Sequence, residues 1–189
     1  MSVNITIAGA SLPEPSNAAD TNWAAMQLAV IQALAAQVAA GPAVQRLSSN
    51  VTPVGTGADT TEDTLMSYSL PGGTLAAAGQ GLRVTAWGTG VNTSDLTTVR
   101  GYFGAALVVS KQLAASTTNV WMVTFNIHRI TNTTQTSSGA FLGAGNTILN
   151  PAPTETLSSS VLLKVTGQRA STSIANSIVQ SAMLVELVP

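Results

Sequence analysis

The sequence has no cysteine and very few charged or aromatic residues. Charged residues make up 8% of its 189 positions and aromatic residues 4%, whereas an average globular protein carries about 25% charge. Without cysteine, disulfide scaffolds and thiolate metal sites are excluded. The seven Lys and Arg residues are scattered singly, so they cannot displace the counterions of a nucleic acid, and nucleic acid is not an expected partner.

Hydrophobic residues are nevertheless abundant, at 45% of the chain, and the remainder is rich in Thr, Ser, Ala and Gly. β-Branched Thr is well suited to the pleated surface of a sheet. Disorder is a poor alternative, because the hydrophobic fraction is high and the net charge is only −1.

Four regions are expected along the chain. Residues 1–19 predict an extended arm, because "VNITIA" alternates like a strand and the following prolines block regular structure. Residues 20–41 predict one apolar α-helix, and residues 42–64 a linker. Residues 65–189 predict a β-sandwich domain, because short strand-like runs recur there between turn residues.

The predicted helix has no charged residue after Asp20. One face of this helix is the seam of a coiled coil, with a 4-3-4-3 spacing of Ala24, Leu28, Ile31, Ala35 and Val38. Self-association is therefore favoured, while packing against the rest of the chain remains an alternative. Membrane insertion is disfavoured by the weak contribution of Ala and by three Gln residues, so no membrane partner is expected. The expected oligomer contacts in the helix are Trp23, Leu28, Ile31, Leu34 and Val38.

The sandwich region contains no helix-length pattern, which predicts an all-β domain with mostly antiparallel strands. The expected strands are 65–70, 81–89, 98–109, 120–130, 134–141, 157–167 and 178–188. Alternation assigns their inward side chains to the core. The expected core residues are Leu82, Val84, Ala86, Val99, Phe103, Ala105, Leu107, Trp121, Val123, Phe125 and Ile127.

The same alternation leaves Arg83 and Trp87 on one outer face, and Arg100 and Tyr102 on the outer face of the next strand. If these strands pair through the turn at 90–97, the four side chains form a small cation–π patch. Ile178 and Leu184 are also expected to point outward. Contiguous exposed apolar residues mark an interface, which predicts subunit packing here. Cover by a loop or by the arm, and a ligand or receptor surface, are the alternatives.

Residues that could carry chemistry are few and isolated. The single histidine, His128, lies within a strand without a nucleophile or an orienting acid in its pattern. The only acidic cluster is "GADTTEDT", whose Asp59, Glu62 and Asp63 leave calcium binding open. The remaining carboxylate candidates for glycoside hydrolysis stand alone in the sequence, at Glu14, Glu155 and Glu186. We therefore expect neither an enzyme nor a cofactor.

The segment "LMSYSLPGGTLAAAGQGLRVTAWGTGVNTSDLTTVRGYFG", residues 65–104, resembles a module of tailed-bacteriophage virion proteins. In that module a "SYTLP"-like strand and a Gly-bounded turn lead into "LRVTAWG", and a "TVRxYFG" strand follows. The likeness covers about 40 residues and is carried by Arg83, Trp87, Arg100, Tyr102 and Phe103. It implies a jelly-roll-like β-sandwich, usually trimeric, on the outside of a particle, and it transfers no catalytic site. The chain departs from the module at "TSDLT", where the family often has Asn-rich residues and a Lys.

Together these features predict a structural virion protein: a homotrimeric capsid decoration (cement) or head-fibre protein at the virion surface, made in the host cytoplasm. Its expected partners are itself and the major capsid protein or another virion protein. The arm would grip that partner by strand addition. The expected anchoring residues are Val3, Ile5, Ile7 and Leu12. A tail-fibre or receptor-binding knob is the alternative, and a glycan-acting enzyme is a weaker one.

Overall fold

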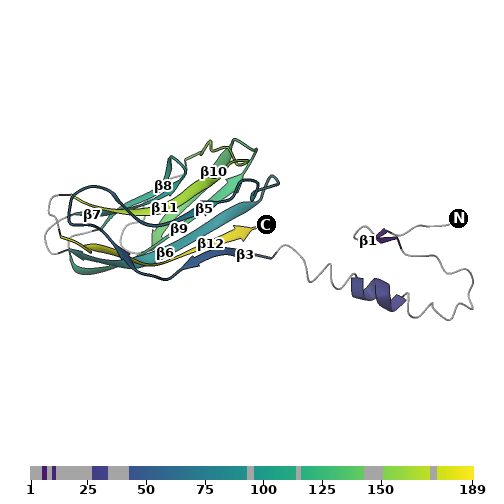
Figure 1. Ribbon diagram of the computed structural model, residues 1–189, viewed down its shortest axis with the longest axis horizontal. Coiled ribbons are helices and arrows are strands. Elements are labelled where there is room, and N and C mark those ends of the chain that lie inside the picture. Colours follow the sequence, from purple (N-terminus) through teal and green to yellow (C-terminus); the bar gives the residue numbers. More distant parts are fainter. Residues whose placement is uncertain are drawn as a thin grey trace, which may run out of the picture. The chain divides into compact units, whose positions relative to one another are not determined.

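The computed structural model of the protein describes residues 6–7, 10–11, 27–33, 43–92, 96–113, 116–142, 151–170 and 174–189. The chain divides into two units, Met1–Ala43 and Val44–Pro189 (Figure 1). The second unit contains both of the large β-sheets.

The first unit contains two very short strands and a helix. Strand β1 (Thr6–Ile7) pairs antiparallel with β2 (Ala10–Ser11). The sequence "VNITIA", expected to be an unpaired extended strand, therefore contributes two residues to a local ladder. Helical structure is described at residues 27–33, inside the helix predicted at 20–41, and the rest of that prediction lies outside the described residues.

The second unit is an antiparallel β-sandwich, which confirms the predicted all-β class. One sheet has six strands in the order β10-β9-β6-β12-β3, with β4 also paired to β12, and the other has four in the order β5-β11-β7-β8. The six strands are β3 (Gln45–Asn50), β4 (Val54–Gly55), β6 (Gly81–Asn92), β9 (Ser116–Arg129), β10 (Gln135–Leu142) and β12 (Ile178–Val188). The four strands are β5 (Asp63–Leu70), β7 (Thr97–Phe103), β8 (Ala106–Leu113) and β11 (Val161–Arg169).

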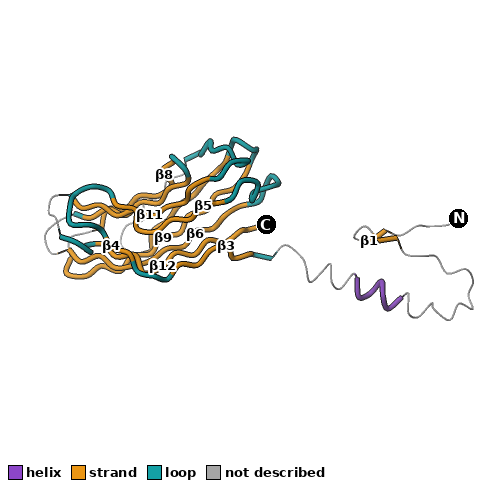
Figure 2. The backbone as a smooth tube through the Cα atoms, viewed as in Figure 1, coloured by secondary structure: helices purple, strands orange, loops and turns teal. Residues whose placement is uncertain are grey.

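Most of the described loops lie at the two ends of the sandwich (Figure 2). At the end called here the attachment end, β3 begins where β12 finishes, with Gln45 opposite Leu187. The first unit joins the sandwich at this end. At the opposite, distal end, β6 and β10 finish while β7, β9 and β12 begin.

The predicted linker at 42–64 is wrong over much of its length, because β3 and β4 both pair with β12. Strand β3 is the edge of the six-stranded sheet and none of its side chains is fully buried. Its sequence, "QRLSSN", lacks the alternation of apolar and polar residues that identifies a half-buried strand. Its pairing depends on the neighbouring strand rather than on its own pattern.

The strand predicted at 98–109 is in fact the hairpin β7–β8, with its turn at Gly104 and Ala105. Gly104 has a φ of 57°, a left-handed conformation that glycine adopts without a steric penalty. This turn resets the alternation, so Ala105 is exposed and Leu107 is only half-buried, contrary to the predicted core positions. The core residues of β8 are instead Val108, Val109 and Leu113.

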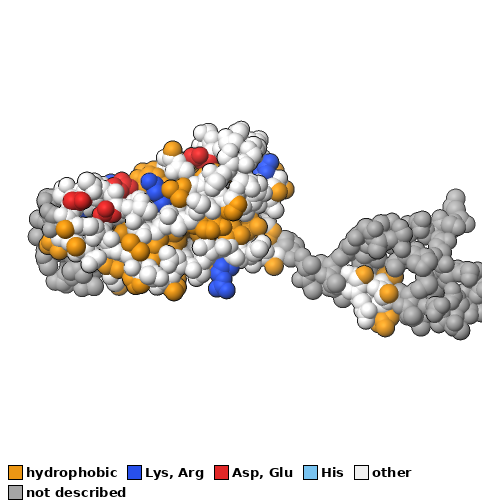
Figure 3. All heavy atoms as spheres, in the orientation of Figure 1, with side chains coloured by type: hydrophobic (Ala, Val, Ile, Leu, Met, Phe, Trp, Pro, Cys, Tyr) orange, Lys and Arg blue, Asp and Glu red, His pale blue; other side chains and the backbone are white. Residues whose placement is uncertain are grey.

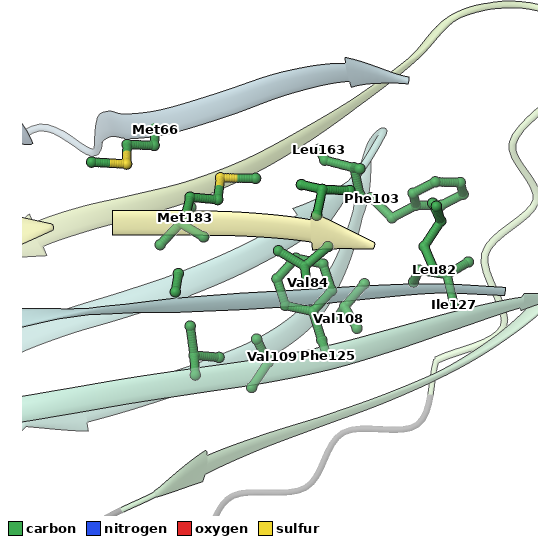
Figure 4. Close-up of a cluster of buried hydrophobic side chains, with 14 of the residues drawn as sticks. Met66, Leu82, Val84, Phe103, Val108, Val109, Phe125, Ile127, Leu163 and Met183 are labelled. Atoms are coloured by element: carbon green, nitrogen blue, oxygen red, sulfur yellow. The ribbon is translucent and has the colours of Figure 1, made fainter. Parts of the chain in front are cut away.

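The core lies between the two sheets (Figure 4). Nine of the predicted inward residues are fully buried there: Leu82, Val84, Ala86, Val99, Phe103, Trp121, Val123, Phe125 and Ile127. Gly101 also faces this core, because a Cβ at that position would lie 2.8 Å from both Phe125 and Val109. A glycine here lets the phenyl ring approach the backbone of the opposite sheet.

Ile178 is buried rather than outward, which corrects its prediction. A β-bulge interrupts the pairing of β12 with β6 between Gln180 and Ala182. Such a bulge adds one residue to a strand and shifts its alternation. Ile178 and Val185 therefore both reach the core, although strict alternation places them on opposite faces.

Candidate functional site

The predicted four-residue patch does not form, because its two strands belong to different sheets. Strand β6 pairs with β9 and β12, whereas β7 pairs with β11 and β8. Strands β6 and β7 are therefore not the two arms of a hairpin. Trp87 therefore lies on the outer face of the six-stranded sheet, and Tyr102 on the outer face of the four-stranded sheet.

The register of the six-stranded sheet gathers large apolar side chains at the distal end of its outer face. Met122 of β9 lies directly opposite Trp87 of β6 and Leu142 of β10. Directly opposed residues of antiparallel strands point to the same face. Val120, two residues before Met122, shares this face. We call these four residues the distal apolar patch.

The distal apolar patch is open to solvent. Val120 is 78% exposed, Leu142 is 59% exposed and Trp87 is 41% exposed, while Met122 is half-buried among them. Exposed large apolar residues are unremarkable singly but indicate an interaction surface when contiguous. Sequence analysis identified Trp87 but missed Leu142 and did not join Val120 to it, because only the register brings three strands together.

Charged residues form a separate row nearer the attachment end of the same face. Glu186 of β12 lies opposite both Arg83 of β6 and Arg46 of β3. The row therefore alternates in sign across three neighbouring strands. Between this row and the patch lie uncharged residues, with Thr85 opposite Thr124 and Leu184. Figure 3 shows how few charged side chains interrupt the apolar and neutral surface of the sandwich in that view.

The outer face of the four-stranded sheet carries a polar network centred on Glu62. Its Oε2 accepts a hydrogen bond from Arg100 Nη1 at 3.1 Å, and its Oε1 accepts one from Thr166 Oγ1 at 2.5 Å. Arg100 Nη1 also donates to Gln168 Oε1 at 2.8 Å. Lys164 Nζ lies 4.8 Å from the centre of the Tyr102 ring, within the range of a cation–π contact.

The network shifts the proton affinities of its members. Burial alone raises the pKa of Glu62, but hydrogen bonds from Thr166 and Tyr102 and the charges of Arg100 and Lys164 outweigh it, so this pKa is lowered. For Tyr102, burial raises the pKa to about 12, with further contributions from the hydrogen bond to Glu62 and its negative charge. Both shifts favour the forms that these groups already have at neutral pH, an ionised Glu62 and a protonated Tyr102.

The acidic cluster expected to be a possible calcium loop is divided among separate contacts. Asp59 Oδ1 accepts hydrogen bonds from the backbone and hydroxyl of Thr61, and Asp63 Oδ2 accepts one from Gly57 N at 2.8 Å. Glu62 faces Arg100 instead. Within the described part of the chain, no group of three His, Cys, Asp or Glu residues is placed to hold a metal ion.

Of the carboxylates considered for hydrolysis, the two that are described, Glu155 and Glu186, do not converge on one site. Glu155 Oε1 accepts a hydrogen bond from Ala105 N at 2.8 Å, and its side chain packs against Gly104, which ties the loop before β11 to the β7–β8 turn. Glu186 belongs to the charged row on the other sheet. His128 lies opposite Gly81 on that outer face. Glu14 lies outside the described residues.

The helix exposes both of its described seam residues: Leu28 is 55% exposed and Ile31 is 62% exposed. Trp23, Leu34 and Val38 lie outside the described residues, as do Val3, Ile5 and Leu12 of the predicted anchor, while Ile7 belongs to β1. In the parts of the chain that are described, no helix is long and apolar enough to cross a bilayer.

Comparisons with known proteins give only weak likenesses. No family model and no curated protein matches the sequence. The CBM2 module of the evolved Dit protein of Lactobacillus casei phage J-1 is similar in structure, with 11% identity and a TM-score of 0.31, over 65% of this chain and 68% of that one. A structure of infectious bursal disease virus, Gt strain, is 13% identical with a TM-score of 0.22, over 79% of this chain and 42% of that one. Both of these neighbours are viral proteins.

Proposed function

We propose that this chain is a structural protein of a tailed-phage virion: a homotrimeric capsid decoration or head-fibre protein, bound to the particle through its N-terminal region. The observation that carries the proposal is the pair of exposed apolar surfaces, Leu28 with Ile31 on the helix and the distal apolar patch on the sandwich. Exposed apolar surfaces of this kind suit a protein whose role is to bind other copies of itself and other virion proteins. The resemblance of residues 65–104 to modules of tailed-bacteriophage virion proteins is the reason for proposing a tailed-phage particle.

The helix is the proposed oligomerisation element. Leu28 and Ile31 are three residues apart, which places them on one face of a helix. Both are exposed in the single chain, and their burial against the same residues of other copies would remove apolar surface from water. The predicted coiled-coil seam continues to Val38, and a third copy would complete the trimer that the resemblance implies.

We also propose that the protein is not an enzyme and needs no cofactor. Glu155 accepts a hydrogen bond from the backbone of the β7–β8 turn, and Glu62 accepts hydrogen bonds from Arg100 and Thr166. A glycosidase needs two carboxylates flanking one bond, one of them free to donate a proton. Glu155 and Glu186 instead lie on elements with separate structural contacts.

The proposed anchor is the N-terminal arm, with Val3, Ile5, Ile7 and Leu12 as its apolar residues. The test uses intact parent particles and antibody raised against residues 65–189, with gold labelling viewed by electron microscopy. Gold over the head is the expected result. Particles carrying a deletion of residues 1–19 are expected to lose the label, while the sandwich remains detectable in the lysate. The absence of gold from wild-type particles would refute the virion assignment.

A receptor-binding knob is the second candidate, and one observation favours it. The distal end, opposite the point where the first unit joins, carries exposed Leu96 and Ile174 beside the ends of several strands. A knob attached at one end commonly contacts its target with the loops at the other. Gold confined to the tail, together with binding of the purified chain to host cells, would select this candidate over decoration.

A further inference from the structure

We propose that the outer face of the six-stranded sheet is the contact between sandwich domains within the oligomer, so that a second copy of this chain covers the distal apolar patch. This inference deepens the proposed oligomer and rests on it. The helix alone could hold copies together while leaving their sandwiches apart. The geometry of the sheet face indicates that the sandwiches also meet.

The charged row on this face favours a second copy as the occupant. Arg83, Glu186 and Arg46 lie side by side on adjacent strands, with the negative residue between the two positive ones. Neighbouring strands are about 4.8 Å apart. Because the row carries both signs of charge, it can meet charges of the opposite sign on another copy of this chain, which suits self-association better than docking to a partner of one charge sign.

The face is also large enough for a stable contact. The eight residue steps from Val120 to His128 on β9 cover about 27 Å, and five strands side by side cover about 24 Å. These dimensions give a projected area of about 650 Å², near the roughly 800 Å² per partner of a standard protein interface. The distal apolar patch would be its apolar part, and the charged row would lie toward the attachment end.

The exposed helix residues add a second, independent contact. Leu28 and Ile31 belong to the same chain as the patch, so association through the helices raises the effective concentration of the sandwiches for one another. The low net charge also favours association of the sandwiches, because copies of a chain with net charge −1 repel one another only weakly. A permanently exposed patch would favour aggregation in such a chain, whereas a patch buried in the oligomer would not.

The test uses the absence of cysteine from the chain, since a single introduced thiol can then be labelled without background. The test position is Leu142→Cys in the distal apolar patch. The matched control is Leu162→Cys, a 42% exposed leucine on strand β11 of the other sheet. Full-length chains are labelled with a maleimide, while light scattering gives the oligomeric state and circular dichroism confirms folding.

The expected result is an oligomer in which Leu142→Cys reacts at least about tenfold more slowly than Leu162→Cys, because a covered thiol reacts only in the open fraction of molecules. Adding Trp87→Lys is expected to restore fast labelling at position 142 while the helix still holds the oligomer.

Equal labelling rates of the two cysteine variants in an oligomer would overturn this inference and leave the virion proposal standing. Slow labelling in a monomer, or slow labelling unaffected by Trp87→Lys, would also overturn it. A monomer that labels equally at both positions would overturn both the inference and the proposed trimer, while gold labelling of particles tests the virion assignment separately.

Discussion

Replacing Glu62 by Gln is expected to destabilise the sandwich by about 1 kcal/mol at neutral pH. The side chains of Glu62 and Arg100 are 31% and 22% exposed, so their ion pair is neither fully exposed nor buried. Exposed pairs contribute about 0.2–1 kcal/mol, and breaking a buried pair costs about 3–5 kcal/mol. Solvent screening keeps the expected destabilisation near the range for exposed pairs. The Gln side-chain oxygen can also still accept the hydrogen bond from Thr166, which limits the loss further.

The pH dependence gives a sharper test of the same contact. The pKa of Glu62 is lowered in the folded protein from its ordinary value of 4.5. A carboxylate with a lowered folded-state pKa stabilises the fold above its unfolded pKa, and this contribution is lost as pH falls through the folded-state value. The stability difference between wild type and Glu62→Gln should therefore be largest near pH 7 and should shrink as the pH falls below the ordinary value of 4.5 toward the lowered folded-state pKa.

The assay is urea unfolding followed by circular dichroism, at a fixed protein concentration and at neutral and acidic pH. Asp59→Asn is the matched control, because Asp59 is an exposed acid of the same loop that accepts its hydrogen bonds from the backbone and hydroxyl of Thr61. It is expected to change stability less than Glu62→Gln. Equal effects of the two variants at pH 7, or a Glu62→Gln difference that persists unchanged at acidic pH, would refute the role assigned to the ion pair.

Two further changes test the core and the β7–β8 turn. Gly101→Ala is expected to cost about 1–3 kcal/mol, because its methyl group meets Phe125 and Val109 at 2.8 Å; adding Phe125→Leu should recover part of this loss in a double-mutant cycle, and strictly additive effects would contradict the contact. Glu155→Ala is expected to cost about 1 kcal/mol through the lost hydrogen bond to Ala105 N. Glu155→Gln should cost less than Glu155→Ala in urea unfolding, since its amide oxygen can still accept; a larger cost for Gln would show that charge, not the hydrogen bond, is what matters.

Most individual strands could be predicted from the sequence, because a strand with one buried face has a period of two residues. Leu82, Val84 and Ala86 are an example, since their alternation with polar neighbours identifies both the strand and its inward face. The helix signal was an equally local property, and helical structure is described at residues 27–33, within the range it predicts. Strand β3 escaped prediction because an edge strand buries few side chains and has little pattern of its own.

Which strands lie next to one another, by contrast, was decided only by the tertiary structure. Strands β6 and β7 follow one another closely in the sequence, yet they lie in different sheets, which separates Trp87 from Tyr102. The same folding brings Glu62 to Arg100 across 38 residues and sets Leu142 and Trp87 on either side of Met122. Alternation states which side of a strand is buried, but the neighbouring strand is selected by packing of the whole core and by bulges and turns that shift register. The sequence by itself therefore determined an all-β sandwich with exposed aromatic and apolar residues, and the fold decided which of them form one surface.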